Sequence, residues 1–269
     1  IALINGVLTN RIRKIEKQAR EEEEKAKTVK LYNTLLNSLS HELKTPIATI
    51  VGATDNLLVE QSNLSDDNRK ELTSTISIAA LRLNQQVENL LSMSRLESGF
   101  IQPKKDWCDI NELVYTVMKR LEQQLKNHAV QINIEENLPL YKLDYGLMEQ
   151  VLYNLLSNAS IYTPEYAAIF ISAKNNADKI YQLNTSTEQH SEVKKENNSL
   201  LLIIEDRGPG FPKEELEKVF DKFYRLNNSK TGGTGLGLSI VKGFVEAHNG
   251  TVTLENVPHG SRFTIEIPA

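Results

Sequence analysis

The sequence of 269 residues lacks several features that would assign it to particular classes of protein. Its one cysteine, Cys108, excludes an intrachain disulfide and favours a reducing compartment. No apolar run reaches the ~20 residues that a membrane-spanning helix needs. The formal net charge of -4 gives no indication of a nucleic-acid partner. What remains is a globular composition, 40% hydrophobic and 25% charged, in a chain long enough for two domains.

The first residues combine a short apolar stretch, residues 1–8, with basic residues between positions 11 and 20. Positive charges of this kind commonly lie on the cytoplasmic side of a membrane span. Two interpretations stay open: residues 1–29 are a membrane-proximal linker helix whose anchor precedes this chain, or they are a frayed terminus. On the first interpretation, the chain is the cytoplasmic portion of a membrane protein.

Two stripes of apolar residues at helical spacing predict a helical hairpin over residues 30–102. One stripe runs from Tyr32 to Ile50, the other from Leu72 to Leu91, and a polar break at 61–69 separates them. A single hairpin buries too little apolar surface to be stable alone. We therefore expect two copies to form a dimeric four-helix bundle.

From residue 103 to 269 the pattern changes to that of an α+β domain with helices on one side of a sheet. Strands are expected at 130–134, 168–173, 200–204, 251–254 and 262–267, and helices at 143–156 and 238–248. The polar stretch 174–199 is predicted to be a mobile loop insertion.

The first motif that carries chemistry is Ser-His-Glu-Leu-Lys-Thr-Pro at residues 40–46. Helical periodicity directs His41 away from the apolar stripe, and an imidazole with a pKa of ~6.5 is mostly neutral and nucleophilic at pH 7. Glu42 can hold the proton of one ring nitrogen while the other attacks phosphorus. Thr45, one turn away, can position a water near a phosphorylated ring. An exposed histidine alone is usually ordinary surface, so the prediction depends on the whole motif.

Two more motifs suggest recognition of a nucleotide. Asn154 and Asn158 share a helix face and offer neutral oxygens to a Mg²⁺ ion that phosphates already chelate. Asp206 follows an apolar strand and can accept a hydrogen bond from the amine of adenine, while Gly208 and Gly210 allow the backbone to approach the base. Each motif alone is weak, since helix caps and turns use the same residues.

A glycine-rich segment before the last expected helix completes the set. Backbone N–H groups and the positive end of a helix dipole suit a polyphosphate, and the polar residues 227–235 fit a lid. The candidate residues of this segment are Gly233, Gly235, Leu236 and Gly237. Just upstream, Lys222 and Arg225 are candidates to face phosphate.

In order and spacing, these motifs resemble the sensor histidine kinases of two-component systems across residues 28–269. Residues 143–163 and 243–250 are similar to the potassium-responsive (KdpD-type) members. The resemblance implies a dimerising HisKA hairpin and an ATP-binding α/β sandwich of the GHKL (Bergerat) type, shared with gyrase, Hsp90 and MutL.

The resemblance also implies an activity: ATP-dependent autophosphorylation of His41, phosphotransfer to an aspartate of a response regulator, and phosphatase activity on that regulator. It makes Glu42 the acid/base partner and Thr45 a residue of the reverse reaction. ATP and Mg²⁺ are the implied cofactors. The implied roles are Mg²⁺ binding for Asn158, phosphate contact for Asn154, adenine recognition for Asp206, and nucleotide contact for Tyr162, Gly208, Gly210, Gly233, Gly235, Leu236 and Gly237.

One departure from the family pattern is Ile161, where these kinases usually have lysine. Either Lys222, Arg225 or Lys230 supplies the missing cation, or ATP binds weakly. Ile161 supports one alternative, a nucleotide-sensing pseudokinase or phosphatase-only module of the same fold. A second alternative, a GHKL ATPase or chaperone, would need no acceptor histidine, and the motif at residues 40–46 argues against it.

Overall fold

The computed structural model describes residues 42–59, 64–99, 101–180, 195–226 and 233–269, together with positions 13, 14, 17 and 40. Contacts divide the chain into two units, Ile1–Gln86 and Val87–Ala269, here called the helical unit and the C-terminal lobe. His41 and most of the expected linker helix, 1–29, lie outside the described residues.

The helical unit contains a helix over residues 42–59 and the first part of α2 (Asp66–Glu97). The hydroxyl of Ser65 accepts a hydrogen bond of 3.2 Å from the N–H of Asn68 at the start of α2, and acidic residues occupy the first turn. Both stretches were expected to be helical. The unit buries small side chains such as Ala53 and Ala79 and leaves larger apolar ones exposed: Ile47, Val51, Leu58, Val59, Ile78 and Leu81.

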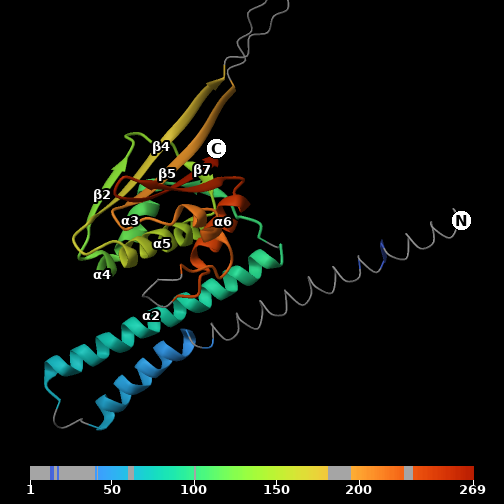
Figure 1. Ribbon diagram of the computed structural model, residues 1–269. Helices are drawn as coiled ribbons and strands as arrows, with labels where there is room; N and C mark the ends of the chain where they lie inside the picture. The colour runs from blue at the N-terminus through green and yellow to red at the C-terminus, as the bar shows by residue number, and fades with distance from the viewer. Residues whose placement is uncertain are drawn as a thin grey trace, which may run out of the picture. The chain divides into compact units, whose positions relative to one another are not determined.

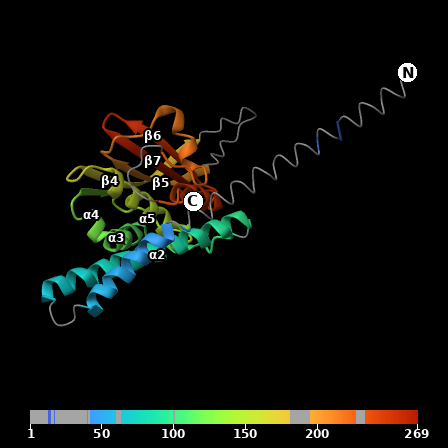
Figure 2. The same ribbon diagram turned by 60° about the horizontal axis from the view of Figure 1, so that its bottom comes forward.

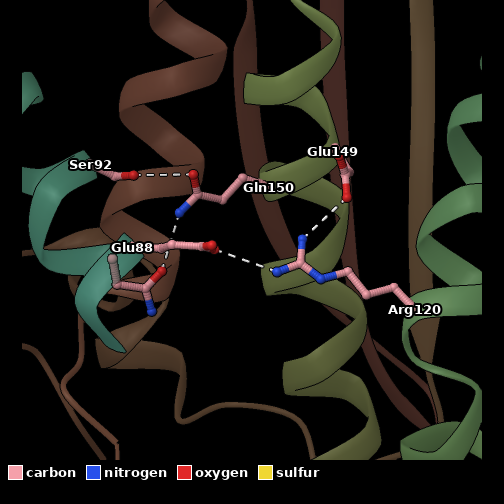
Figure 3. Close-up of polar contacts among 6 residues, drawn as sticks. Glu88, Ser92, Arg120, Glu149 and Gln150 are labelled. Atoms are coloured by element: carbon pink, nitrogen blue, oxygen red, sulfur yellow. Dashed lines mark hydrogen bonds and ion pairs between the residues drawn. The ribbon is translucent and has the colours of Figure 1, made fainter. Parts of the chain in front are cut away.

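The last turns of α2 belong to the C-terminal lobe. The Ser92 hydroxyl donates to Oε1 of Gln150 (3.1 Å; Figure 3). Nε2 of Gln150 donates to Oδ1 of Asn89 (3.3 Å). Met93 is buried in the core of the lobe. A Cβ on Gly243 would lie 2.5 Å from a methyl carbon of Leu96. The end of α2 therefore packs closely against the helix that contains Gly243, at a residue that has no side chain.

An arginine joins three helices beside these contacts. Arg120 bonds Glu88 at 3.4 Å and Glu149 at 3.2 Å (Figure 3), and its guanidinium lies 4.4 Å from the ring centre of Tyr153. These groups are partly exposed, so the ion pairs contribute less than the packing of Met93 and Leu96.

The centre of the lobe is a five-stranded sheet in the order β2-β4-β5-β7-β6. β2 and β4 are parallel and the other neighbours antiparallel. The strands are β2 (Ala129–Ile134), β4 (Ala168–Ile180), β5 (Lys195–Asp206), β6 (Thr251–Val257) and β7 (Gly260–Pro268). A separate two-stranded sheet pairs β1 (Asp106–Cys108) with β3 (Tyr141–Leu143).

Helices cover one face of the five-stranded sheet, as Figures 1 and 2 show. They are α3 (Ile110–Arg120), α4 (Glu122–Leu125), α5 (Tyr145–Tyr162) and α6 (Gly237–Ala247), and two short 3₁₀ turns lie at Lys213–Glu215 and Lys218–Phe220. Asp109 and Asp144 cap the N-termini of α3 and α5 by accepting hydrogen bonds from backbone N–H groups. Apolar side chains of α5 and of the sheet form one core, which confirms the predicted two-layer sandwich.

The predicted loop at 174–199 is wrong at both of its ends. β4 continues to Ile180 and β5 begins at Lys195, in a register that runs from Asn175 opposite Leu200 to Ile180 opposite Lys195. A strand ladder uses backbone groups, so polar side chains did not prevent the pairing. Residues 181–194 lie outside the described residues. Within the described part of the chain, none of the helices combines the length and apolar composition needed to cross a bilayer.

Candidate nucleotide site

The carboxylate of Asp206, at the end of β5, is 8% exposed and held from two sides. Its Oδ1 accepts a hydrogen bond of 2.7 Å from the N–H of Gly208, and its Oδ2 accepts a short one from the hydroxyl of Ser261. A carboxylate oxygen can accept more than one hydrogen bond. The group is therefore fixed in place and still able to accept from an exocyclic amine.

Two glycines allow the backbone to approach this carboxylate closely. A Cβ on Gly208 would lie 2.7 Å from Oδ1 of Asp206 and 3.2 Å from the carbonyl of Tyr162, at the end of α5. A Cβ on Gly260 would lie 1.9 Å from the carbonyl oxygen of Asp206, and the φ of Gly260 is 149°. Any side chain at either position would move the carboxylate or its strand.

The predicted asparagine pair lies further along α5, beside the start of α6. Asn154 is 5% exposed, and its Nδ2 donates to the carbonyl of Gly237 at 3.3 Å. Asn158, one turn on, is half-buried, and its amide bonds none of the residues that the structure describes. Its oxygen thus remains available to a hard cation such as Mg²⁺, which prefers oxygen ligands.

The second glycine segment contacts the phenylalanine segment before it. The N–H of Phe223 donates to the carbonyl of Gly235 at 2.9 Å, and a Cβ on Gly235 would lie 2.7 Å from the Phe223 carbonyl carbon. Gly235 has a φ of 67°, whereas a Cβ on Gly233 would meet open space. Leu236 is fully buried and anchors this segment at the start of α6.

The basic side chains that were candidates to face phosphate differ in their surroundings. Nζ of Lys222 pairs with Glu97 of α2 at 3.2 Å. Arg225 is exposed and has an interaction partner of its own, and Lys230 lies outside the described residues. Ile161 is 47% exposed, so its apolar side chain lies at the surface.

The acceptor segment is described from Glu42 onward. Glu42 is half-buried and Thr45 exposed in the helix 42–59, and the carbonyl of Thr45 accepts from the hydroxyl of Thr49 at 3.0 Å. This segment belongs to the helical unit, whereas the nucleotide residues above belong to the C-terminal lobe.

Sequence reasoning missed one residue of the site, Ser261, and one buried histidine of the lobe, His248. Ser261 belongs to the site because β7 pairs with β5. The only indication of it in the sequence was the Gly260-Ser261 pair at the start of β7. His248 is fully buried, with Nε2 accepting from the N–H of Asp144 (2.9 Å) and Nδ1 donating to the Phe244 carbonyl (2.8 Å). Both partners require the neutral ring, and burial lowers the pKa of His248.

Comparison with known families assigns both regions. Residues 32–99 match the His Kinase A (phospho-acceptor) domain, and residues 144–269 match the histidine kinase-, DNA gyrase B- and HSP90-like ATPase. The chain belongs to the histidine kinase family. The HisKA match spans His41, and the ATPase match spans the Asp206 carboxylate and the Asn154–Asn158 face of this histidine kinase.

The curated relatives include the sensor protein KdpD of Clostridium acetobutylicum, 35% identical over 92% of this chain and 26% of the relative. KdpD of Escherichia coli is 33% identical over 94% of this chain and 26% of its own length. This chain thus spans about a quarter of these relatives. Among solved structures, the histidine kinase AdeS of Acinetobacter baumannii has a TM-score of 0.56 at 25% identity, over 85% of this chain and 97% of that one.

Proposed function

We propose that this chain is the catalytic part of a sensor histidine kinase, which transfers the γ-phosphoryl group of ATP to His41 and then to an aspartate of a response regulator. The observation that carries the proposal is the Asp206 carboxylate, fixed by Gly208 and Ser261 beside the end of α5. The same helix presents the unbonded amide of Asn158. The match to a phosphoacceptor domain across residues 32–99 supports His41 as the acceptor.

In this proposal the C-terminal half of α5, from Asn154 to Tyr162, runs along the nucleotide. Asp206 accepts a hydrogen bond from the adenine amine, with Gly208, Gly210 and Tyr162 beside the base. Tyr162 lies eight positions after Asn154, which is ~12 Å of helix. The phosphates then lie near Asn154 and near the N-terminus of α6, whose segment includes Gly233, Gly235, Leu236 and Gly237.

Asn158, together with the phosphates, would hold Mg²⁺, which would offset charge on the transferring group. One ring nitrogen of His41 attacks the γ-phosphorus, and the bond from phosphorus to the bridging oxygen of ADP breaks. Glu42 takes the proton of the other ring nitrogen and stabilises the positive charge that grows on the ring. For dephosphorylation of the regulator, Thr45 positions a water that attacks the aspartyl phosphate, and the P–O bond to the aspartate breaks to release inorganic phosphate.

Labelling with γ-labelled ATP and Mg²⁺ tests the proposal. Wild type is expected to acquire an acid-labile, base-stable label, and His41→Gln to acquire none while binding ADP as wild type does. Persistent label on His41→Gln would contradict the acceptor assignment. Normal ADP binding without label on wild type would favour the second candidate, a nucleotide-sensing or phosphatase-only module, for which the exposed Ile161 is the supporting observation.

The proposal includes two associations. A homodimer through the helical unit is supported by the exposure of Ile47, Val51 and Leu81 on its helices. Anchoring to a membrane through a segment preceding this chain, with this part on the cytoplasmic side, is supported by the basic residues between positions 11 and 20. Sedimentation of the purified chain and fractionation of cells that express the full-length protein test these two associations separately.

A further inference from the structure

A row of three polar side chains crosses the sheet beside the adenine-recognition loop. Asn256 on β6 lies directly opposite Ser261 on β7. β7 pairs with β5 in a register that ends with Glu205 opposite Arg262, which brings Asp206 next to Ser261. The first two members of the row, Asp206 and Ser261, bond each other. The third, Asn256, bonds neither of them.

Asn256 instead holds the far end of the glycine loop, residues 207–211. Its Nδ2 donates to the carbonyl of Phe211 at 2.6 Å, and its Oδ1 accepts from the N–H of Phe211 at 2.9 Å. One amide side chain thus bonds both backbone groups of one residue, as a neighbouring strand would. The ring of Phe211 packs edge-on against Phe263, with ring centres 6.1 Å apart.

The loop fits closely around this amide. Gly210 has a φ of 72°, and a Cβ there would lie 2.8 Å from Oδ1 of Asn256. At the other end of the loop, the N–H of Gly208 bonds Asp206. The loop is therefore tethered at both ends, by Asp206 at residue 208 and by Asn256 at residue 211, and only the short stretch through Pro209 lies between the tethers.

We propose that Asn256 is a positioning residue for nucleotide binding, which acts by ordering the loop of Gly208 and Gly210 before the adenine arrives. The inference rests on the proposed function of Asp206. Asn256 is exposed, so water replaces its hydrogen bonds when it is removed, and the folded state loses little stability. The cost falls on binding, because a disordered loop must then be ordered by the ligand.

The experiment titrates ADP with Mg²⁺ into the whole chain and its variants by calorimetry. Asn256→Ala removes both hydrogen bonds to Phe211, and we expect roughly five- to twenty-fold weaker ADP binding, because the ligand must then order the loop. Asn256→Asp keeps the shape and the acceptor but sets a charged oxygen against the Phe211 carbonyl. It should bind at least as weakly as Asn256→Ala.

Asn176→Ala is the matched control, because Asn176 bonds Glu266 (3.2 Å) at the opposite end of the same sheet. It should bind ADP as wild type does. Amide hydrogen exchange should rise at residues 207–211 in the Asn256 variants, and their melting temperatures should stay close to that of Asn176→Ala. In labelling kinetics, the KM for ATP should rise while kcat is kept, as for a loss of ground-state binding.

Three results would overturn the inference: ADP binding within twofold of wild type in Asn256→Ala, wild-type binding in Asn256→Asp, or an equal loss in Asn176→Ala. Asp206→Asn separates this failure from that of the proposed function. If Asp206→Asn binds ADP normally, the assignment of adenine to this loop fails as a whole. If only the Asn256 variants bind normally, the assignment stands and the role of Asn256 is refuted.

Discussion

The helical unit and the C-terminal lobe differ in where they place their apolar side chains. In the helical unit, Val59 is 83% exposed and Leu81 69%, and the buried residues described there include the small side chains of Ala53 and Ala79. In the lobe, Leu152, Ile169 and Ile265 are fully buried between the helices and the sheet. Burying one such side chain contributes about 1.5–3 kcal/mol to stability. The lobe gains this contribution within one copy, whereas the exposed side chains of the helical unit do not.

This difference in burial indicates that the two parts have different roles. The lobe needs a rigid core because it holds the Asp206 carboxylate in place, which requires β5, β6 and β7 in fixed register. In the proposed dimer, a second copy covers the exposed apolar side chains of the helical unit, which carries the acceptor segment. Nucleotide binding should therefore respond to changes in the lobe, and assembly to changes in the helices. Each prediction below tests that separation.

The largest effect is expected at the fixed carboxylate. Asp206→Asn replaces one carboxylate oxygen by an NH2 group, so the side chain can no longer accept from both Gly208 and Ser261. A hydrogen bond to a charged group contributes about 1.5–3 kcal/mol, so we expect roughly 10- to 100-fold weaker ADP binding by calorimetry. Ser261→Ala should have the same direction and a smaller size. Unchanged sedimentation of Asp206→Asn is the control, and a changed oligomeric state would break the separation.

Next is the glycine of the second nucleotide segment. In Gly235→Ala, the new Cβ meets the backbone of Phe223 at a φ of 67°, which we expect to cost about 2 kcal/mol or more. The melting temperature of the lobe should fall by about 4–8 °C. Gly233→Ala, in open space, is the matched control and should melt as wild type. Equal melting temperatures for the two variants would mean that the Phe223 contact is not required.

The helices supply the third test. Leu81→Asp places a charge on an exposed apolar position of α2, and should weaken the dimer by about tenfold or more because each dimer contains two copies. Analytical ultracentrifugation measures the change, and ADP affinity should stay at the wild-type value. Leu140→Asp, at a leucine of the lobe that is 51% exposed, is the control and should leave the dimer intact. Equal dissociation in both variants would remove the contrast between the regions.

The smallest effect is the pH dependence of the lobe. Burial lowers the pKa of His248, so the unfolded chain binds more protons than the folded one once the pH falls below ~6.5. Stability is then full above that pH and is lost as the pH falls through the lowered pKa. Thermal unfolding between pH 8 and 5.5 should show this loss in wild type and in His259→Ala, whose histidine is exposed. It should be smaller in His248→Gln; an unchanged slope there would assign the loss to another group.

The spacing of apolar residues in short sequence windows predicted the longer helices and the apolar parts of the strands. The apolar stretches at 168–173 and 200–204 became β4 and β5, and the helical stretch at 143–156 became α5. The extension of β4 and β5 into the polar segment was missed because polarity indicates a loop, although ladders need only backbone groups. The strands β1 and β3 were missed because three residues carry too little periodicity.

The same limit applies to the site. Asp206, Asn154 and Asn158 stand in compact motifs that the sequence displays directly. Ser261 and Asn256 join the site only through the pairing of β7 with β5 and β6, which brings together residues 55 and 45 positions apart. A register of this kind depends on the whole sheet, so no local window contains it.

One measurement tests the central claim, that the acceptor lies in one region and the nucleotide site in the other. ADP binding and labelling from γ-labelled ATP are measured side by side on His41→Gln and Asp206→Asn. Both variants should lose the label, and only Asp206→Asn should lose ADP binding. Loss of ADP binding in His41→Gln, or full labelling of Asp206→Asn, would contradict the claim.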